Sequence, residues 1–226
     1  MPGKLKKKQK KLNPSSKIRF INPESPDLRI LKEAAKIIRR GGIIIFPTRG
    51  LYGLAGDALN PDVVSRIFEI KSRPSAKPLL VLVKKQESLK SLVQNIPMHA
   101  RQLMKKFWPG KLTIIFSAQQ TLSKILTGNT GKIGIRLPGY PVALALAKLL
   151  DNPITGTSAN LSGQPGVADI RNLDSTILHK VDLVLDAGPL AGGKGSTVVD
   201  VTENKCCIIR EGFISAEQVF AALNIT

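Results

Sequence analysis

Three cationic side chains, Lys71, Arg73 and Lys77, lie close together on a segment that contains two prolines. No carboxylate interrupts the run from Lys71 to Pro78. Proline fixes its own φ angle and restricts the residue before it, so the segment should be stiff. Positive charge that is held in place suits a polyanion such as a nucleotide triphosphate. Charge alone favours a solvated basic loop, so the rest of the chain must decide between the two interpretations.

A helix and a strand should position this basic loop. The residues before it, from Pro61 to Ile70, carry apolar side chains at helical spacing, and Asn60 with Pro61 forms a helix-start signature. The residues after it, from Leu79 to Val83, form a short apolar run that is typical of a buried strand. The cations therefore lie between a helix and a strand.

Other polar side chains follow strand-like runs. Thr48 comes just after the apolar run Ile43–Phe46, and Ser158 and Asn160 follow the run 153–156. Between Arg49 and Gly56, three glycines surround Tyr52 and predict a loop whose backbone can approach a ligand closely. Because ligands gather outside strand ends in open α/β sheets, we expect these groups to share one site.

Two arginines and a serine belong to the same pattern. Arg136 lies inside an otherwise apolar strand, and a buried arginine needs an anionic partner. Ser196 precedes another apolar strand, and Arg210 ends a third. Arginine at such positions can hold phosphate or carboxylate in a bidentate manner. Each residue alone also fits a turn, a cap or an ion pair, and only their joint placement favours a ligand site.

Other signatures of chemistry are weak. Residues 188–195 nearly match the P-loop pattern, but Gly195 stands where Ser or Thr should reach Mg²⁺, and strand-like residues follow instead of a helix. Cys206 and Cys207 are adjacent in a strand-like run, where they should be buried, point to opposite faces and form no disulfide. No His, Cys and Asp cluster has metal-ligand spacing, so we predict no metal site built by the chain.

Composition and charge predict a folded protein with anionic partners. Hydrophobic residues make up 42% of the 226 residues, and no apolar run is long enough to span a membrane. The basic N-terminus lacks the apolar region of a secretory signal, which predicts a cytoplasmic protein. The formal charge is +18, of which residues 1–19 supply eight lysines and arginines and no acid, leaving 18 − 8 = +10 elsewhere. We expect residues 1–19 to form a disordered tail, which either contacts nucleic acid or only solubilises the protein.

Residues 20–226 should form one α/β domain. Helix and strand signals alternate along most of this range without a long linker or a fixed repeat. The late strand-like runs 182–186, 197–201 and 206–210 cluster without helices between them, which argues against a purely parallel sheet. We predict a twisted mixed sheet, with parallel and antiparallel pairs, flanked by helices.

In their order along the chain, these residues resemble the YrdC-like family of L-threonylcarbamoyladenylate synthases. The resemblance extends roughly from Leu28 to Leu223 and therefore covers almost everything but the tail. The motifs that carry it are Phe46-Pro47-Thr48 with Tyr52-Gly53-Leu54, Lys71-x-Arg73-Pro74 with Lys77-Pro78-Leu79, Trp108-Pro109-Gly110, Ile135-Arg136-Leu137-Pro138, Ser158-Ala159-Asn160-x-Ser162-Gly163, Ser196-Thr197-Val198-Val199-Asp200 and Ile208-Ile209-Arg210-x-Gly212.

The resemblance implies a YrdC-like fold with a positively charged concave cavity, and a nucleotidyltransferase reaction. ATP, with Mg²⁺, would react with L-threonine and bicarbonate to give threonylcarbamoyl-AMP and pyrophosphate. The product would serve threonylcarbamoylation of tRNA, through transfer proteins that act downstream. The separate C-terminal domain of longer relatives is not expected within these 226 residues.

The family motifs also imply roles for single residues. Lys71 and Arg73 would be the catalytic cations, which stabilise charge on the leaving pyrophosphate, and Lys77 would join them at the triphosphate. The other positions and their implied ligands are Thr48 and Tyr52 (substrate), Ser158 and Asn160 (nucleotide and carbonate), Arg136 and Ser196 (threonine), and Arg210 (nucleotide).

Some positions depart from the family pattern. Arg49 and Gly50 replace the Glu-Thr that usually follows Thr48, and that second threonine contacts the amino acid. Leu82 stands where a histidine is frequent, and Lys111 replaces a proline. These differences keep an alternative open, a YciO-like protein that binds nucleotide or RNA, such as tRNA or double-stranded RNA, without the synthase reaction. A third hypothesis is an enzyme on the same fold that carbamoylates or adenylates a different acid.

Overall fold

The computed structural model describes residues 17–203 and 205–224. Most of the predicted basic tail, residues 1–16, lies outside the described residues. Ile18–Phe20 form strand β1, so the ordered fold begins inside the range assigned to the tail. The Lys17 ammonium donates to the carbonyls of His179 and Val181, which attaches this end of β1 to the body.

The first of two sheets has five strands in the order β1-β9-β2-β3-β8. Strand β9 (Leu183–Asp186) pairs in parallel with both β1 and β2 (Ile44–Pro47). Strands β3 (Tyr52–Ala55) and β8 (Thr157–Ser158) continue the sheet in antiparallel fashion. Strand β3 takes up half of the segment that was predicted to be a glycine-rich loop. Its pairing with β2 and β8 makes that part of the segment rigid.

The second sheet has six strands in the order β11-β10-β5-β6-β4-β7. The β10–β5 and β4–β6 pairs are parallel, and the other pairs are antiparallel. The strands are β4 (Leu80–Leu82), β5 (Leu112–Ser117), β6 (Lys132–Arg136), β7 (Ile154–Thr155), β10 (Thr197–Asp200) and β11 (Cys207–Arg210).

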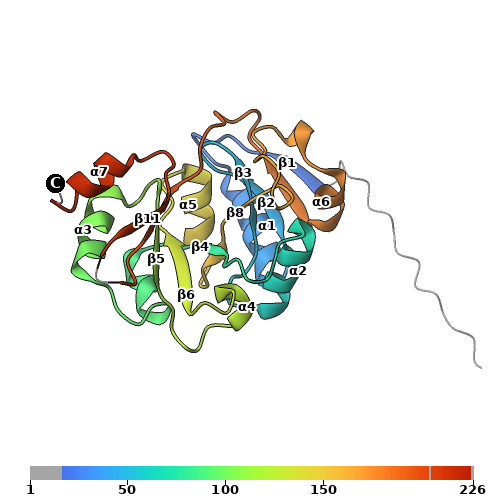
Figure 1. Cartoon of the computed structure of the whole chain (residues 1–226). Coiled ribbons are helices and arrows are strands. Elements are labelled where there is room, and N and C mark those ends of the chain that lie inside the picture. Colours follow the sequence, from blue (N-terminus) through green and yellow to red (C-terminus); the bar gives the residue numbers. More distant parts are fainter. Residues whose placement is uncertain (1–16, 204, 225–226) are drawn as a thin grey trace, which may run out of the picture.

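One short segment joins the two sheets. β7 belongs to the second sheet and β8 to the first, and only Gly156 separates them. Figure 1 shows the sheets side by side, with β5 and β6 in one half of the molecule and β2 and β3 in the other. The chain that continues from β7 into β8 therefore lines the boundary between the halves.

Helices cover both sheets and complete two apolar clusters. Helix α1 (Leu28–Arg39) and α5 (Pro141–Lys148) pack against each other and against β2. Helix α2 (Pro61–Lys71) belongs to a larger cluster that includes β5 and β6. The remaining helices are α3 (Met98–Phe107), α4 (Lys124–Thr127), α6 (Ser175–Lys180) and α7 (Ala216–Ala221), with 3-10 turns at Gln86–Ser91 and Ile170–Asn172.

The mixed α/β prediction is confirmed, with the strands divided between two sheets instead of one. The predicted burial of both cysteines is wrong, because Cys207 is exposed and Cys206 is half-buried; both are free thiols. Residues 188–195 lead into strand β10, whereas a P-loop leads into a helix, so this segment is not a P-loop. Among the described residues, no helix has the length and apolar character needed to cross a membrane.

Candidate functional site

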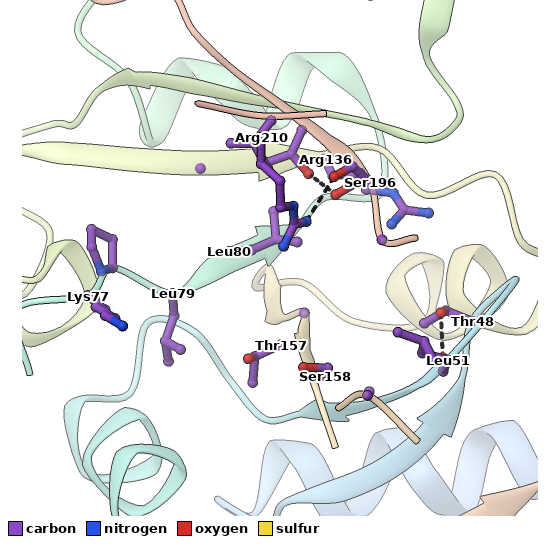
Figure 2. Close-up of a pocket in the computed structure, with 18 of the residues that line it drawn as sticks. Thr48, Leu51, Lys77, Leu79, Leu80, Arg136, Thr157, Ser158, Ser196 and Arg210 are labelled. Atoms are coloured by element: carbon purple, nitrogen blue, oxygen red, sulfur yellow. Dashed lines mark hydrogen bonds between the residues drawn. The ribbon is translucent and has the colours of Figure 1, made fainter. Parts of the chain in front are cut away.

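A cavity of about 690 Å³ opens between the two sheets. All of the site residues predicted from the sequence line it, with the exception of Lys71. Figure 2 shows Arg136, Ser196 and Arg210 on one side of the hollow, with Thr157 and Ser158 across from them. The first three come from the second sheet and its strand ends, whereas Thr157 and Ser158 form β8 of the first.

Arg73 shapes the basic loop as well as lining the cavity. Helix α2 ends at Lys71, and Ser72 adopts a left-handed backbone with φ of 47° that turns the chain. The Arg73 guanidinium then donates to the carbonyls of Lys77 (3.1 Å) and Pro78 (2.9 Å). Burial lowers the pKa of Arg73, so an anion that enters the cavity would meet a poorly solvated charge. The loop is folded around its own arginine.

Lys71 lies behind the cavity wall and not on it. Its side chain is buried, and its ammonium donates to the carbonyls of Ser158 and of Asn160, the latter at 2.6 Å. The Lys71 carbonyl in turn accepts from the Ser162 amide at 2.8 Å. The structure thus differs from the expectation that Lys71 contacts the triphosphate, because the group that would do so holds the 158–162 turn instead.

The turn that Lys71 holds contains a buried acceptor without a partner among the described residues. The Asn160 amide nitrogen donates to the carbonyls of Leu161 (2.8 Å) and Gln164 (2.7 Å). Its Oδ1 is buried and has no hydrogen-bond partner among the residues that the structure describes. A buried acceptor without a donor is costly, so the Asn160 side chain lowers the stability of the turn unless a further donor reaches it.

Two arginines at the ends of strands, Arg136 on β6 and Arg210 on β11, form the opposite wall. Arg136 donates from Nε to the Gly110 carbonyl at 2.7 Å, and Arg210 donates to the Ser196 carbonyl at 2.8 Å (the dashed lines in Figure 2 include this bond). The Ser196 hydroxyl shares a 2.7 Å hydrogen bond with Thr113. Burial and, secondly, the charge of Arg49 lower the pKa of Arg136 to about 10. Both effects make an anionic ligand favourable here.

Thr48 and Tyr52 line the cavity, but their hydroxyls already have partners. Thr48 donates to the Leu51 carbonyl at 2.5 Å. The Tyr52 hydroxyl donates to the Gly188 carbonyl (2.7 Å) and accepts from the Ala187 amide (2.9 Å). Burial is the main cause that raises the pKa of Tyr52. The Tyr52 bonds anchor the segment that follows β9, and the Thr48 bond closes the β2–β3 turn, so both side chains mainly position backbone.

Four cations that line the cavity were given no site role in the sequence analysis: Arg49, Lys111, Lys132 and Lys194. The basic lining residues are Arg49, Arg73, Lys77, Lys111, Lys132, Arg136, Lys194 and Arg210, and no Asp or Glu is among the described residues of the lining. Lys132 pairs with Asp200 at 2.9 Å, and Lys111 stacks 4.2 Å from the Phe213 ring centre. Strand alternation gave a signal for one of them, because Lys132, Gly134 and Arg136 share a face of β6.

The described residues contain no group of three or more His, Cys, Asp or Glu side chains that could hold a metal ion. The cavity lining has the donors that phosphate and carboxylate prefer and lacks the carboxylate oxygens that Mg²⁺ prefers.

Comparison with known proteins gives one consistent family. The family model Sua5_yciO_yrdC, described as telomere recombination, matches residues 36–212. A Pyrococcus abyssi protein named threonylcarbamoyl-AMP synthase is 35% identical over 189 residues, which are 84% of this chain and 56% of that protein. The chain thus spans little more than half the length of this relative.

Two solved structures resemble this one closely. The P. abyssi Sua5 structure in complex with L-threonine superposes with a TM-score of 0.84 at 32% identity, over 91% of this chain and 60% of that one. Escherichia coli YciO superposes with a TM-score of 0.81 at 28% identity, over 89% of this chain and 98% of that one.

Proposed function

This chain belongs to the Sua5/YciO/YrdC family, and from that premise we propose that it is a threonylcarbamoyl-AMP synthase. The reaction joins ATP, L-threonine and bicarbonate to give threonylcarbamoyl-AMP and pyrophosphate. It would take place in the cytoplasm and supply proteins that transfer the threonylcarbamoyl group to tRNA. The observation that carries the proposal is one cavity lined by predicted motif residues from both sheets, with basic and no acidic side chains among its described residues.

The chemistry asks for positioning and charge more than for a covalent nucleophile. The threonine amine attacks the carbon of bicarbonate, and water leaves to give a carbamate. A carbamate oxygen then attacks the α-phosphorus of ATP, the bond to the bridging oxygen breaks, and pyrophosphate departs. Phosphoryl transfer of this kind depends on orientation and on preorganised positive charge.

The residues present supply these needs. Arg73 and Lys77 would hold the triphosphate, to which Mg²⁺ is bound as part of the substrate. Arg210, Ser158 and Asn160 would hold the nucleotide and the carbonate, and Arg136 with Ser196 would face the threonine. Lys71 would act through the 158–162 turn that it holds, as a positioning residue and not as a direct ligand.

The test is pyrophosphate release by the purified full chain with ATP, L-threonine and labelled bicarbonate. We expect release that requires threonine, together with a labelled adenylate product. Arg73→Gln should lower the rate by about 10²-fold or more, as deletion of one preorganised donor does elsewhere. Pyrophosphate release that is absent, or that is indifferent to threonine, would refute the proposal.

A second candidate function is nucleotide or RNA binding without this reaction. One observation favours it: at Gly50, where the family motif has a threonine, the structure leaves no room for a side chain, because a Cβ would lie 2.4 Å from the Gly192 carbonyl oxygen. RNA bound by the basic residues should dissociate steeply as salt rises. Salt-sensitive binding of double-stranded RNA, combined with no threonine-dependent pyrophosphate, would favour this second function.

A further inference from the structure

The turn between β2 and β3 holds its backbone firmly at the edge of the cavity. The Thr48 amide and hydroxyl both donate to the Leu51 carbonyl, at 3.1 and 2.5 Å. On the other side, the Gly192 amide donates to the Gly50 carbonyl at 3.0 Å. Arg49 therefore projects from a backbone that is fixed on both sides, although its own side chain is exposed.

This turn has only one side chain with unused hydrogen-bond donors for a ligand. The approach of Gly192 excludes a side chain at position 50, and the Thr48 hydroxyl is already bonded to Leu51. Arg49 lines the cavity, and none of the ion pairs among the described residues includes it. Its guanidinium is thus the group that this turn offers to a substrate.

Arg136 approaches the same space from the second sheet. Its Nε is held by the Gly110 carbonyl at 2.7 Å, which fixes the plane of the guanidinium. Its terminal nitrogens have no hydrogen-bond or ion-pair partner among the described residues, and the positive charge of Arg49 contributes to its lowered pKa. Two guanidiniums that repel each other inside a cavity without acids are stabilised when an anion lies between them.

We propose that Arg49 and Arg136 form a two-arginine clamp for the carboxylate of the amino-acid substrate. This inference rests on the proposed function and adds a residue to it. Arg136 binds from the sheet and Arg49 from the turn, so Arg49 supplies contacts that Gly50, without a side chain, does not. The clamp recognises the carboxylate and leaves the triphosphate to the basic loop.

The clamp predicts a selective defect in Arg49→Gln, which removes the charge and keeps most of the side-chain length. The KM for threonine should rise about 10-fold or more, the usual effect of losing a charged hydrogen-bonded pair, while the KM for ATP changes less than about twofold. The KM of Arg49→Lys for threonine should lie between those of Arg49→Gln and wild type, because lysine keeps the charge and loses the bidentate fork. The matched control is Arg101→Gln, an exposed arginine on α3 outside the cavity, with unchanged constants.

A binding measurement separates the clamp from the reaction. Calorimetry with L-threonine and with L-threoninamide, which lacks the carboxylate, should show that Arg49→Gln weakens binding of the first about 10-fold and leaves binding of the second unchanged. Equal losses for the two ligands, or wild-type threonine affinity in Arg49→Gln, would overturn the clamp while synthase activity stands. A wild-type protein that neither binds nor consumes threonine would overturn both the clamp and the proposed function.

Discussion

At the scale of single residues, a buried ammonium explains how the wall that contains residues 158–162 is held. Lys71 has almost no exposed surface, and it bonds two backbone carbonyls of the turn that carries Ser158 and Asn160. Backbone oxygens can stabilise a buried charge only if they stay in place. The basic motif thus contains two kinds of cation: Arg73 and Lys77 line the cavity, and Lys71 supports it from behind.

Lys71→Met should test this supporting role. The substitution keeps the volume and leaves two buried carbonyls without a donor, so we expect a loss of about 1–3 kcal/mol in the free energy of unfolding. Urea denaturation measures it. Lys77→Met, at an exposed lysine of the same loop, should change stability by less than about 0.5 kcal/mol while it weakens ATP binding. Equal stability of the two variants would contradict the supporting role of Lys71.

The same lysine should give a pH signature. Burial, and secondly the charge of Arg73, lower the pKa of Lys71 to about 8, whereas an unfolded lysine titrates near 10.4. Between these values the unfolded state binds more protons, so the lysine's contribution to stability rises with pH in this window. Wild type should therefore gain stability relative to Lys71→Met from about pH 8 to pH 10. A difference between the two proteins that stays constant, or shrinks, would show that the pKa of Lys71 is not lowered.

At the scale of elements, the β2–β3 turn and residues 188–195 contact each other beside the cavity. Gly50→Ala would place a Cβ 2.4 Å from the Gly192 carbonyl oxygen, so one of the two segments must move. We expect a loss of about 1–3 kcal/mol in unfolding free energy. The control is Gly134→Ala on β6, whose Cβ would meet Thr113 at an ordinary 3.5 Å and should leave stability unchanged or slightly higher. If Gly50→Ala unfolded at the same midpoint temperature as wild type, the close contact would be contradicted.

The elements also show what a sequence can predict. Helix α2 was predicted because its signals are local: Asn60 caps the amides of Asp62 and Val63, and apolar residues repeat along one face. Strands β1 and β8 were missed because each is short and depends on partners far along the chain, such as β9 and β3. The glycines around Tyr52 predicted a loop, whereas pairing with β2 makes part of that segment a strand.

The residues of the site also divide into those with a local sequence signal and those whose position depends on distant parts of the chain. Arg136, Ser196 and Arg210 were predicted from polar residues in or beside apolar strands, which is a local pattern, and they line the cavity. Lys111 directly precedes strand β5 and could have been found by the same pattern, whereas the place of Lys194 in the lining depends on how the sheets approach each other. Lys71 and Arg73 are nearly adjacent in sequence, and only the folded structure places one behind the wall and the other on it.

At the scale of the whole molecule, the cavity is a property of two sheets, and the shortest of the connections between them is the single residue Gly156. Ile154–Thr155 pairs in one sheet and Thr157–Ser158 in the other, and the cavity is lined by residues of both halves and by Gly156 between them. A nucleotide that binds across this boundary should restrict local opening on both sides, because binding to the native state alone stabilises it.

Hydrogen exchange of backbone amides with and without MgATP tests this arrangement. We expect slower exchange at two places far apart in the sequence, residues 157–162 on the first wall and residues 195–197 on the second. Arg73→Gln should abolish both effects together, since the basic loop would hold the triphosphate that both walls depend on. The exposed end of α3, outside the cavity, should exchange at the same rate in either condition. Slowing at only one of the two walls would show that the ligand binds to a single sheet and that the cavity between the sheets is not the nucleotide site.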